Sequence, residues 1–149
     1  MTAATDRIKA LKELQTQRPM GELETLCIER QIRDLSRGHK RGLVWDENEA
    51  QRAVKFFGLL THWKGHFAGQ PVTLEPWQEH CQIAPLFGWR QKCGARRFRE
   101  GYDEEPRKNG KTTKSSGIAL FGLIADREEG AEVYKIGRAS CRERVSSPV

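Results

Sequence analysis

The sequence lacks any apolar run long enough to span a membrane. A transmembrane helix needs about 18 or more consecutive apolar residues, whereas this chain of 149 residues is 37% hydrophobic and 31% charged. Its opening stretch, MTAATDRIKALKELQTQRP, also lacks the apolar core of a secretory signal. The composition therefore predicts a soluble, cytoplasmic protein with no membrane partner and about one domain's worth of chain.

Cysteine and histidine are few and do not form a recognisable framework. The four cysteines, at positions 27, 81, 93 and 141, include no C-x-x-C pair, which favours reduced, partly buried thiols over a disulfide scaffold. His62 and His66 have the i, i+4 spacing of a zinc pair on a helix, but no third ligand is evident. We therefore expect no metal at these histidines.

The excess of positive over negative charge is also small over most of the chain. The formal net charge is +6, but residues 135–149 alone contribute four basic residues and one acid. Half of the excess therefore belongs to a short terminal stretch, and charge by itself is weak evidence for a polyanionic partner.

The first 42 residues predict a polar, helical region. Apolar positions recur at helical spacing and indicate an amphipathic helix that ends near Gly38; they are Leu23, Leu26, Ile28, Ile32 and Leu35. The basic stretch RGHKRG follows. It is either a solvated turn or a patch that contacts DNA.

Two further helices have local start signals. Asp46 is a good N-cap with Glu49 three residues later, as in a capping box, and the predicted buried face contains Ala50, Ala53, Val54, Phe57 and Leu60. The segment HWKGHFAGQP then predicts a loop. Pro76 suits the first turn of the next helix, which Pro85 is expected to kink or shorten.

The stretch EEPRKNGKTTKSSG, which begins at Glu104, contains the end of a phosphate-binding loop without its beginning. Gly110 lets the backbone approach a phosphate closely, Lys111 supplies a positive charge, and the Thr112 hydroxyl is a magnesium ligand in such loops. Arg107 adds charge that an ordinary turn does not need. Glu105, however, stands five residues before Gly110, where the usual motif has another glycine.

The surroundings of the loop predict a strand–loop–helix–strand unit. The segment IALFGLIA, residues 118–125, is apolar almost all round, as expected of a packed helix, and GAEVYKIG at 130–137 resembles the start of a strand. The segment CGARRFREGYDEEP at 93–106 would be the preceding strand, although Gly101, Asp103 and Glu105 are unusual in a buried parallel strand. From spacing alone, a basic turn before a core helix remains an alternative to a nucleotide site.

Taken together, these segments resemble one family. PRKNGKT is similar to the variant Walker A motif of bacteriophage terminase large subunits, in which the first glycine is often absent and an arginine stands inside the loop. EAQRAVKFF, HWKGHFAGQPVTLEPWQ, LFGW, RRFRE and GAEVY also resemble the family's N-terminal ATPase segment, in the family's order. The resemblance runs from about residue 21 to Tyr134.

The resemblance implies roles for individual residues, and ATP and Mg²⁺ as cofactors. Arg107 is similar to the loop arginine that helps to trigger hydrolysis, and Lys111 would take part with it in catalysis. The nucleotide would be held by Gln78, Arg107, Lys108, Asn109, Gly110, Lys111, Thr112 and Thr113. Among these, Gln78 would read adenine and Thr112 would bind magnesium. Trp77 would either pack beside the base or be an ordinary core aromatic residue.

The implied fold is α/β, an incomplete P-loop NTPase domain of the ASCE type with a helical N-terminal region. The whole protein would be a hydrolase in the cytoplasm of a bacterial host. It would package double-stranded phage DNA and act as an endonuclease. It would form a homo-oligomeric ring on the portal, with portal protein and the terminase small subunit as partners. The Walker B acids and the nuclease domain would lie beyond Tyr134, so the fragment is not expected to hydrolyse ATP alone.

The last stretch matches no terminase segment. IGRASCRERV, residues 136–145, resembles a translated sequencing adapter. We therefore expect a helical region and linker over residues 1–42, the N-terminal part of the ATPase domain over 43–134, and an artefactual tail over 135–149. Two other functions remain open: another P-loop enzyme, such as a helicase or nucleotide kinase, and a small basic DNA-binding module without enzymatic activity.

Overall fold

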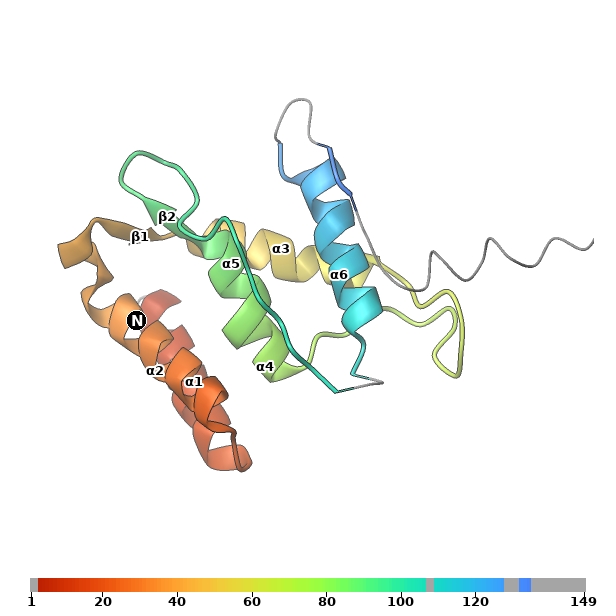
Figure 1. Cartoon of the computed structure of the whole chain (residues 1–149), viewed down its shortest axis with the longest axis horizontal. Helices are drawn as coiled ribbons and strands as arrows, with labels where there is room; N and C mark the ends of the chain where they lie inside the picture. Colours follow the sequence, from red (N-terminus) through yellow and green to blue (C-terminus); the bar gives the residue numbers. More distant parts are fainter. Residues whose placement is uncertain (1–2, 107–108, 128–131, 135–149) are drawn as a thin grey trace, which may run out of the picture. The chain divides into compact units, whose positions relative to one another are not determined.

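A computed structural model describes residues 3–106, 109–127 and 132–134. The chain divides into two compact units, residues 1–104 and the part from Glu105 onward (Figure 1). Each unit is described separately. No helix among the described residues is long and apolar enough to cross a membrane.

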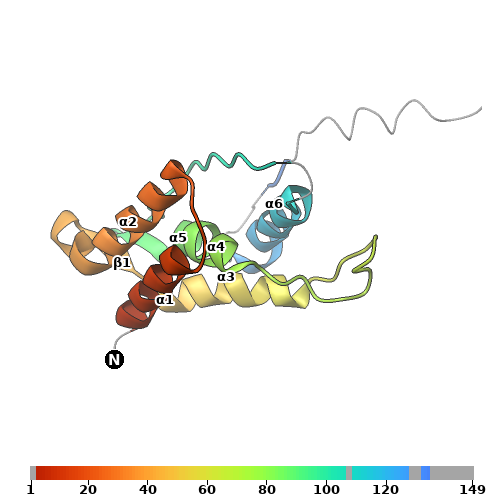
Figure 2. The same cartoon turned by 90° about the horizontal axis from the view of Figure 1, so that it is seen from below.

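The predicted N-terminal helical region consists of two helices. Helix α1 spans Ala3–Gln17 and α2 spans Glu22–Arg37, and the two lie side by side in both views (Figures 1 and 2). The expected end near Gly38 is confirmed, since Gly38 is the C-cap of α2. The basic stretch after it forms a 3₁₀ helix, η1, Gly38–Arg41, in which Arg41 pairs with the buried Asp34.

Helix α3, Glu47–Leu59, begins as its capping signal predicts. The Asp46 side chain accepts a hydrogen bond from the Glu49 amide at 3.1 Å, and Ala50, Ala53 and Phe57 are buried. Strand β1, Leu43–Trp45, ends directly before the capping residue Asp46 and pairs antiparallel with β2, Trp89–Gln91. These two strands form the two-stranded sheet of the described residues.

The helix that begins at Pro76 runs to Gly88 through three consecutive segments. They are α4, Pro76–Gln78, the π-helical η2, Glu79–Ile83, and α5, Ala84–Gly88. The π segment lies directly before Pro85, which has no N–H to donate to the preceding turn. The helix therefore widens at this point, and it is not ended by the proline.

Unit 1 has its core where these helices meet. Leu11, Leu14 and Ile28 form a buried cluster against which Trp77 and Cys81 pack. On the other side of the helix that contains α5, a Cβ atom added to Gly88 would lie 2.8 Å from the Trp45 ring. Only glycine allows this close approach between α5 and the residues at the start of α3.

The described residues of unit 2 form one helix in two segments, α6, Lys111–Leu120, and the π-helical η3, Phe121–Ala125. A helix lies where one was expected after the loop, but its packing is not confirmed, because Leu120, Leu123 and Ile124 are exposed. The flanking strands are not confirmed either: residues 97–106 and 132–134 form no strand. The described residues therefore show a helix-rich protein with a small antiparallel sheet, and the parallel sheet of a P-loop unit is not among them. The remainder of the predicted second strand lies outside the described residues.

Candidate phosphate-binding loop

The residues from Asn109 to Thr113 lie at the N-terminus of α6. Gly110 is the N-cap, with φ +74° and ψ 11°, a left-handed conformation that glycine adopts without strain. The Lys114 amide donates to the Gly110 carbonyl at 2.9 Å, which closes the first turn. In any α-helix the backbone N–H groups of the first turn have no acceptor within the helix, and they point toward its N-terminal end.

The side chains expected to contact phosphate lie at this end. Asn109, Lys111 and Thr112 are exposed, and Thr113 is half-buried. The Lys111 ammonium donates to the carbonyl oxygen of Glu105, so its side chain reaches back over the loop. The structure thus brings Asn109 to Thr113 together at one helix end, while Arg107 and Lys108 lie outside the described residues.

A buried ion pair closes the base of the loop. Glu105, the residue at the position of the missing glycine, pairs with Lys114 in the first turn of α6. Each side chain is only 5% exposed. Because burying a charge is costly unless it is paired, this contact fixes the distance between the chain before the loop and the helix after it.

The aromatic residue proposed near adenine lies in the core of unit 1. Trp77 packs against the cluster of Leu11, Leu14 and Ile28, which agrees with an ordinary core role. Gln78 is buried, and its side-chain oxygen accepts a hydrogen bond from the Glu75 amide at 3.0 Å as part of a capping box. A carboxamide oxygen accepts two hydrogen bonds, so capping does not occupy the whole group.

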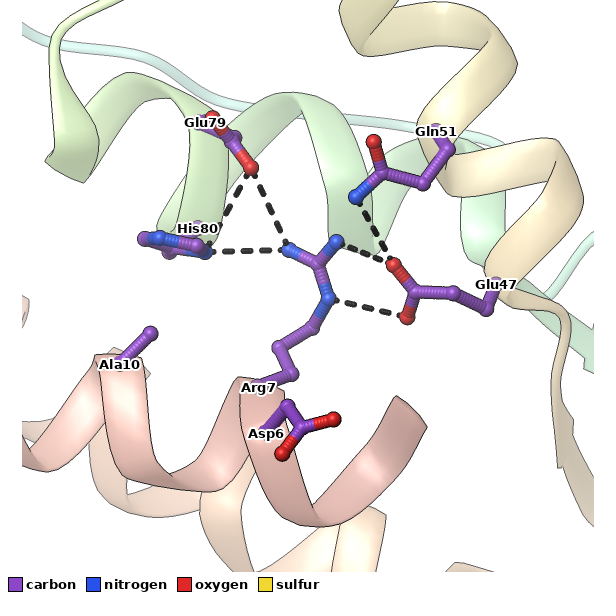
Figure 3. A pocket seen from close by; sticks show the side chains of 7 residues that line it. All are labelled: Asp6, Arg7, Ala10, Glu47, Gln51, Glu79 and His80. Carbon is purple, nitrogen blue, oxygen red and sulfur yellow. Dashed lines mark hydrogen bonds and ion pairs between the residues drawn. The ribbon is translucent and has the colours of Figure 1, made fainter. Parts of the chain in front are cut away.

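A second cluster of charges joins three segments of unit 1. The Arg7 side chain, 3% exposed, contacts both carboxylate oxygens of Glu47, at 2.6 and 3.2 Å, and His80 Nδ1 at 3.0 Å (Figure 3). A hollow of about 390 Å³ adjoins it, lined by Asp6, Arg7, Ala10, Glu47, Gln51, Glu79 and His80. Because Arg7 is surrounded by its own acidic partners, we interpret this cluster as a structural joint between α1, α3 and η2.

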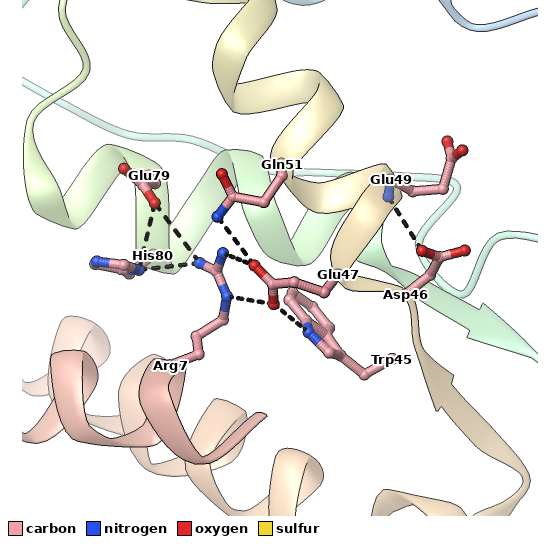
Figure 4. Close-up of polar contacts among 8 residues, drawn as sticks. All are labelled: Arg7, Trp45, Asp46, Glu47, Glu49, Gln51, Glu79 and His80. Carbon is pink, nitrogen blue, oxygen red and sulfur yellow. Dashed lines mark hydrogen bonds and ion pairs between the residues drawn. The ribbon is translucent and has the colours of Figure 1, made fainter. Parts of the chain in front are cut away.

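Glu47 is the centre of that joint (Figure 4). Besides Arg7, it accepts hydrogen bonds from Trp45 Nε1 at 2.8 Å and from Gln51 Nε2 at 2.9 Å. Burial raises the pKa of the Glu47 carboxyl, but these hydrogen bonds and the Arg7 charge outweigh burial and leave its pKa below the ordinary value. The ionised form is therefore the form that holds α1 in place.

Residues 76–142 match the family model described as terminase large subunit, ATPase domain. This match supports the interpretation of the chain as a fragment of a terminase large subunit. The match covers slightly less than half of the chain and includes both Gln78 and the whole loop. No curated protein and no solved structure matched the chain.

The structure shows contacts that the sequence did not predict. The sequence drew attention to Glu105 as a missing glycine and as an unusual residue in a buried strand, but it did not point to Lys114. The two residues form the ion pair beneath the loop. Arg7, Glu47 and His80 come from segments far apart along the chain. No local spacing signals either contact. No group of three His, Cys, Asp or Glu residues suited to a metal ion occurs among the described residues.

Burial of His80 predicts a loss of stability at low pH. Burial, as the main cause, lowers the pKa of His80 below its ordinary value of 6.5, and the Arg7 charge lowers it further, while Glu79 and Glu47 oppose these effects. The unfolded chain therefore takes up a proton more readily than the folded chain as the pH falls below about 6.5. We expect the midpoint temperature of thermal unfolding to fall less in His80→Gln than in the wild type when the pH is lowered from 7 to 5. The control is His39→Gln. Equal pH dependence of the midpoint in His80→Gln and the wild type would contradict this prediction.

Cys27 is expected to be the most reactive thiol among Cys27, Cys81 and Cys93, all of which are free. A side-chain hydrogen bond with Cys81 and the nearby Arg30 charge outweigh burial and lower the pKa of Cys27 to about 6, whereas the pKa of Cys81 is raised. The lowered pKa increases the thiolate fraction of Cys27 at neutral pH, and the thiolate is the nucleophilic form. Alkylation by iodoacetamide, mapped by peptide mass spectrometry, should modify Cys27 before the exposed Cys93. Faster modification of Cys93 would be evidence against this ionisation.

Proposed function

We propose that this chain is the N-terminal ATPase segment of a bacteriophage terminase large subunit and that it binds ATP with Mg²⁺ at residues 107–113. The observation that supports the proposal is the combination of the family match with the start of α6. The match includes the loop, and Gly110 has a positive φ immediately before a helix of ten residues.

Each residue of the loop has a proposed task. The backbone of Asn109 and Gly110 forms the cradle, Lys111 contacts the β- and γ-phosphates, and Thr113 supports the first turn. The Thr112 hydroxyl is the proposed magnesium ligand, and the bound Mg²⁺ would neutralise phosphate charge. This choice fits the structure, since Lys111 and Thr112 are both exposed at the helix end.

Arg107, Lys108 and Gln78 complete the proposed nucleotide contacts. Arg107 would stabilise charge on the γ-phosphate together with Lys111, and Lys108 would add attraction for the triphosphate. Gln78 would read adenine through the part of its carboxamide that does not cap α4. Since the Gln78 oxygen already bonds to the Glu75 amide, adenine contact would use its second lone pair and its amide N–H groups.

For the whole protein we propose the motor function of the family. It would hydrolyse ATP to move double-stranded phage DNA into a procapsid and would cut that DNA as an endonuclease. It would act in the host cytoplasm as a ring on the portal protein, with the small subunit as a partner. Hydrolysis is proposed for the whole protein and not for this chain alone.

The proposal is tested by calorimetric titration of the full chain with a non-hydrolysable ATP analogue, with and without Mg²⁺. We expect saturable binding that Mg²⁺ strengthens, because the metal joins the Thr112 hydroxyl to the phosphates. Absence of binding in both conditions would contradict the proposed nucleotide site.

A further inference from the structure

The loop between α3 and α4 has a defined shape. Thr61 and Pro71 form an antiparallel bridge at its base, and His62 exchanges two backbone hydrogen bonds across it, with Gln70 at 2.9 Å and Gly69 at 2.7 Å. Gly65 and Gly69 turn the chain with φ values of +84° and +83°. In Figure 2 this yellow-green segment extends beyond the end of α3. We call residues 61–71 the aromatic loop.

The aromatic loop presents two rings to solvent. Trp63 is 81% exposed and Phe67 is 56% exposed. The Lys64 ammonium lies 4.2 Å from the centroid of the Trp63 ring, and the His62 and His66 rings lie 5.8 and 5.3 Å from that of Phe67. Large aromatic side chains gain little from such exposure in a free protein, so their position indicates a surface for a partner.

The sequence around the rings excludes negative charge. Residues 50–74 contain no Asp or Glu, whereas they contain Lys55, Lys64 and the two histidines of the aromatic loop. Arg52 also lies in this range, but its charge is paired with Glu49 at 2.6 Å. A protein partner could use the rings alone. A polyanion with flat, stackable groups uses both the rings and the positive charge beside them, so the combination favours nucleic acid over protein.

We propose that the aromatic loop binds unpaired nucleotides of a nucleic acid strand. Trp63 and Phe67 would stack on bases, and Lys64 would contact the neighbouring phosphate. In a duplex the base faces are already stacked on each other, so only a single strand offers them to exposed rings. The inference does not depend on the nucleotide site of unit 2, because every residue that carries it belongs to unit 1.

The test is fluorescence anisotropy of the full chain with a fluorescein-labelled oligothymidylate and with a labelled mixed-sequence duplex of equal length. We expect tighter binding to the single strand. Trp63→Ala should weaken it about 10-fold, within the range measured for one stacked base, while Trp63→Phe should retain most of the affinity. Lys64→Gln should reduce the slope of log affinity against log salt by about 0.7. Lys12→Gln, on the exposed face of α1, removes the same charge elsewhere and should leave that slope unchanged.

Several outcomes would overturn the proposal. The first is an absence of binding to the single strand. The second is an equal reduction of the salt slope in Lys64→Gln and Lys12→Gln. The third is an equal effect of the aromatic-loop variants on affinity for the duplex and for the single strand. Sedimentation of the same variants distinguishes another occupant: if Trp63→Ala abolishes self-association and leaves oligonucleotide affinity unchanged, the aromatic loop is a contact between copies of the chain. Circular dichroism checks folding, and if Trp63→Ala unfolds the chain, the salt slope of Lys64→Gln alone decides the matter.

Discussion

Replacing Lys111 by alanine is expected to weaken binding of a non-hydrolysable Mg·ATP analogue about 10- to 100-fold. The ammonium of Lys111 lies at the N-terminus of α6, where its side chain bends back toward the Glu105 carbonyl. Hydrogen bonds to charged groups contribute about 1.5–3 kcal/mol, and about 1.4 kcal/mol corresponds to a tenfold change in affinity. The removed contact joins two charged groups, the Lys111 ammonium and a phosphate, so its loss should account for most of the fall in affinity.

The matched control for this prediction is Lys12→Ala. Lys12 is an exposed lysine of α1 in the other unit, so its removal changes net charge by the same amount without touching the loop. Calorimetric titration should show near wild-type affinity for Lys12→Ala. Equal affinity of the wild type and Lys111→Ala would remove the basis for the phosphate site.

The second large effect is expected at Glu105 and Lys114. Removing one member of a buried ion pair leaves the other charge without compensation, which costs about 3–5 kcal/mol. Lys114→Met or Glu105→Gln should therefore destabilise α6 by this order of magnitude. The double variant Glu105→Leu with Lys114→Met should recover much of the loss, because it buries no charge.

Amide hydrogen exchange in α6 is the appropriate readout, since it reports opening of this helix separately from unit 1. Lys9→Met is the control, because Lys9 pairs with Glu13 on the surface of α1 with both side chains more than half exposed. Such surface pairs contribute about 0–1 kcal/mol. If exchange in α6 is as slow in Lys114→Met as in the wild type, the ion pair does not hold the loop.

Signals confined to one turn of chain could be predicted from the sequence. Asp46 and Glu49 predicted the start of α3, Pro76 predicted the start of α4, and Gly38 the end of α2. The capping box between Glu75 and Gln78 was not predicted, because Glu is not among the usual N-cap residues, and Gln78 was interpreted as an adenine contact instead. The predicted features depend on neighbouring residues, so a local pattern contains the information.

Features that depend on distant partners could not be predicted in this way. The strand expected before the loop did not form, and the described part of the chain offers β1 and β2, which pair with each other. A strand needs a neighbour to satisfy its backbone hydrogen bonds, and polar Asp103 gives it little apolar surface to bury. The Glu105–Lys114 pair and the Arg7–Glu47 pair likewise join residues whose separation follows no helix or strand period.

The most direct test of the phosphate site is a backbone amide NMR titration of the ¹⁵N-labelled chain with a Mg·ATP analogue. The account predicts that the largest shifts occur at residues 109–113, because the amides at the start of α6 donate to the phosphates. It also predicts that Lys111→Ala needs about 10- to 100-fold more analogue to reach the same shifts. Shifts concentrated around Arg7 and Glu47, or shifts at 109–113 that saturate at the same concentration in Lys111→Ala, would contradict it.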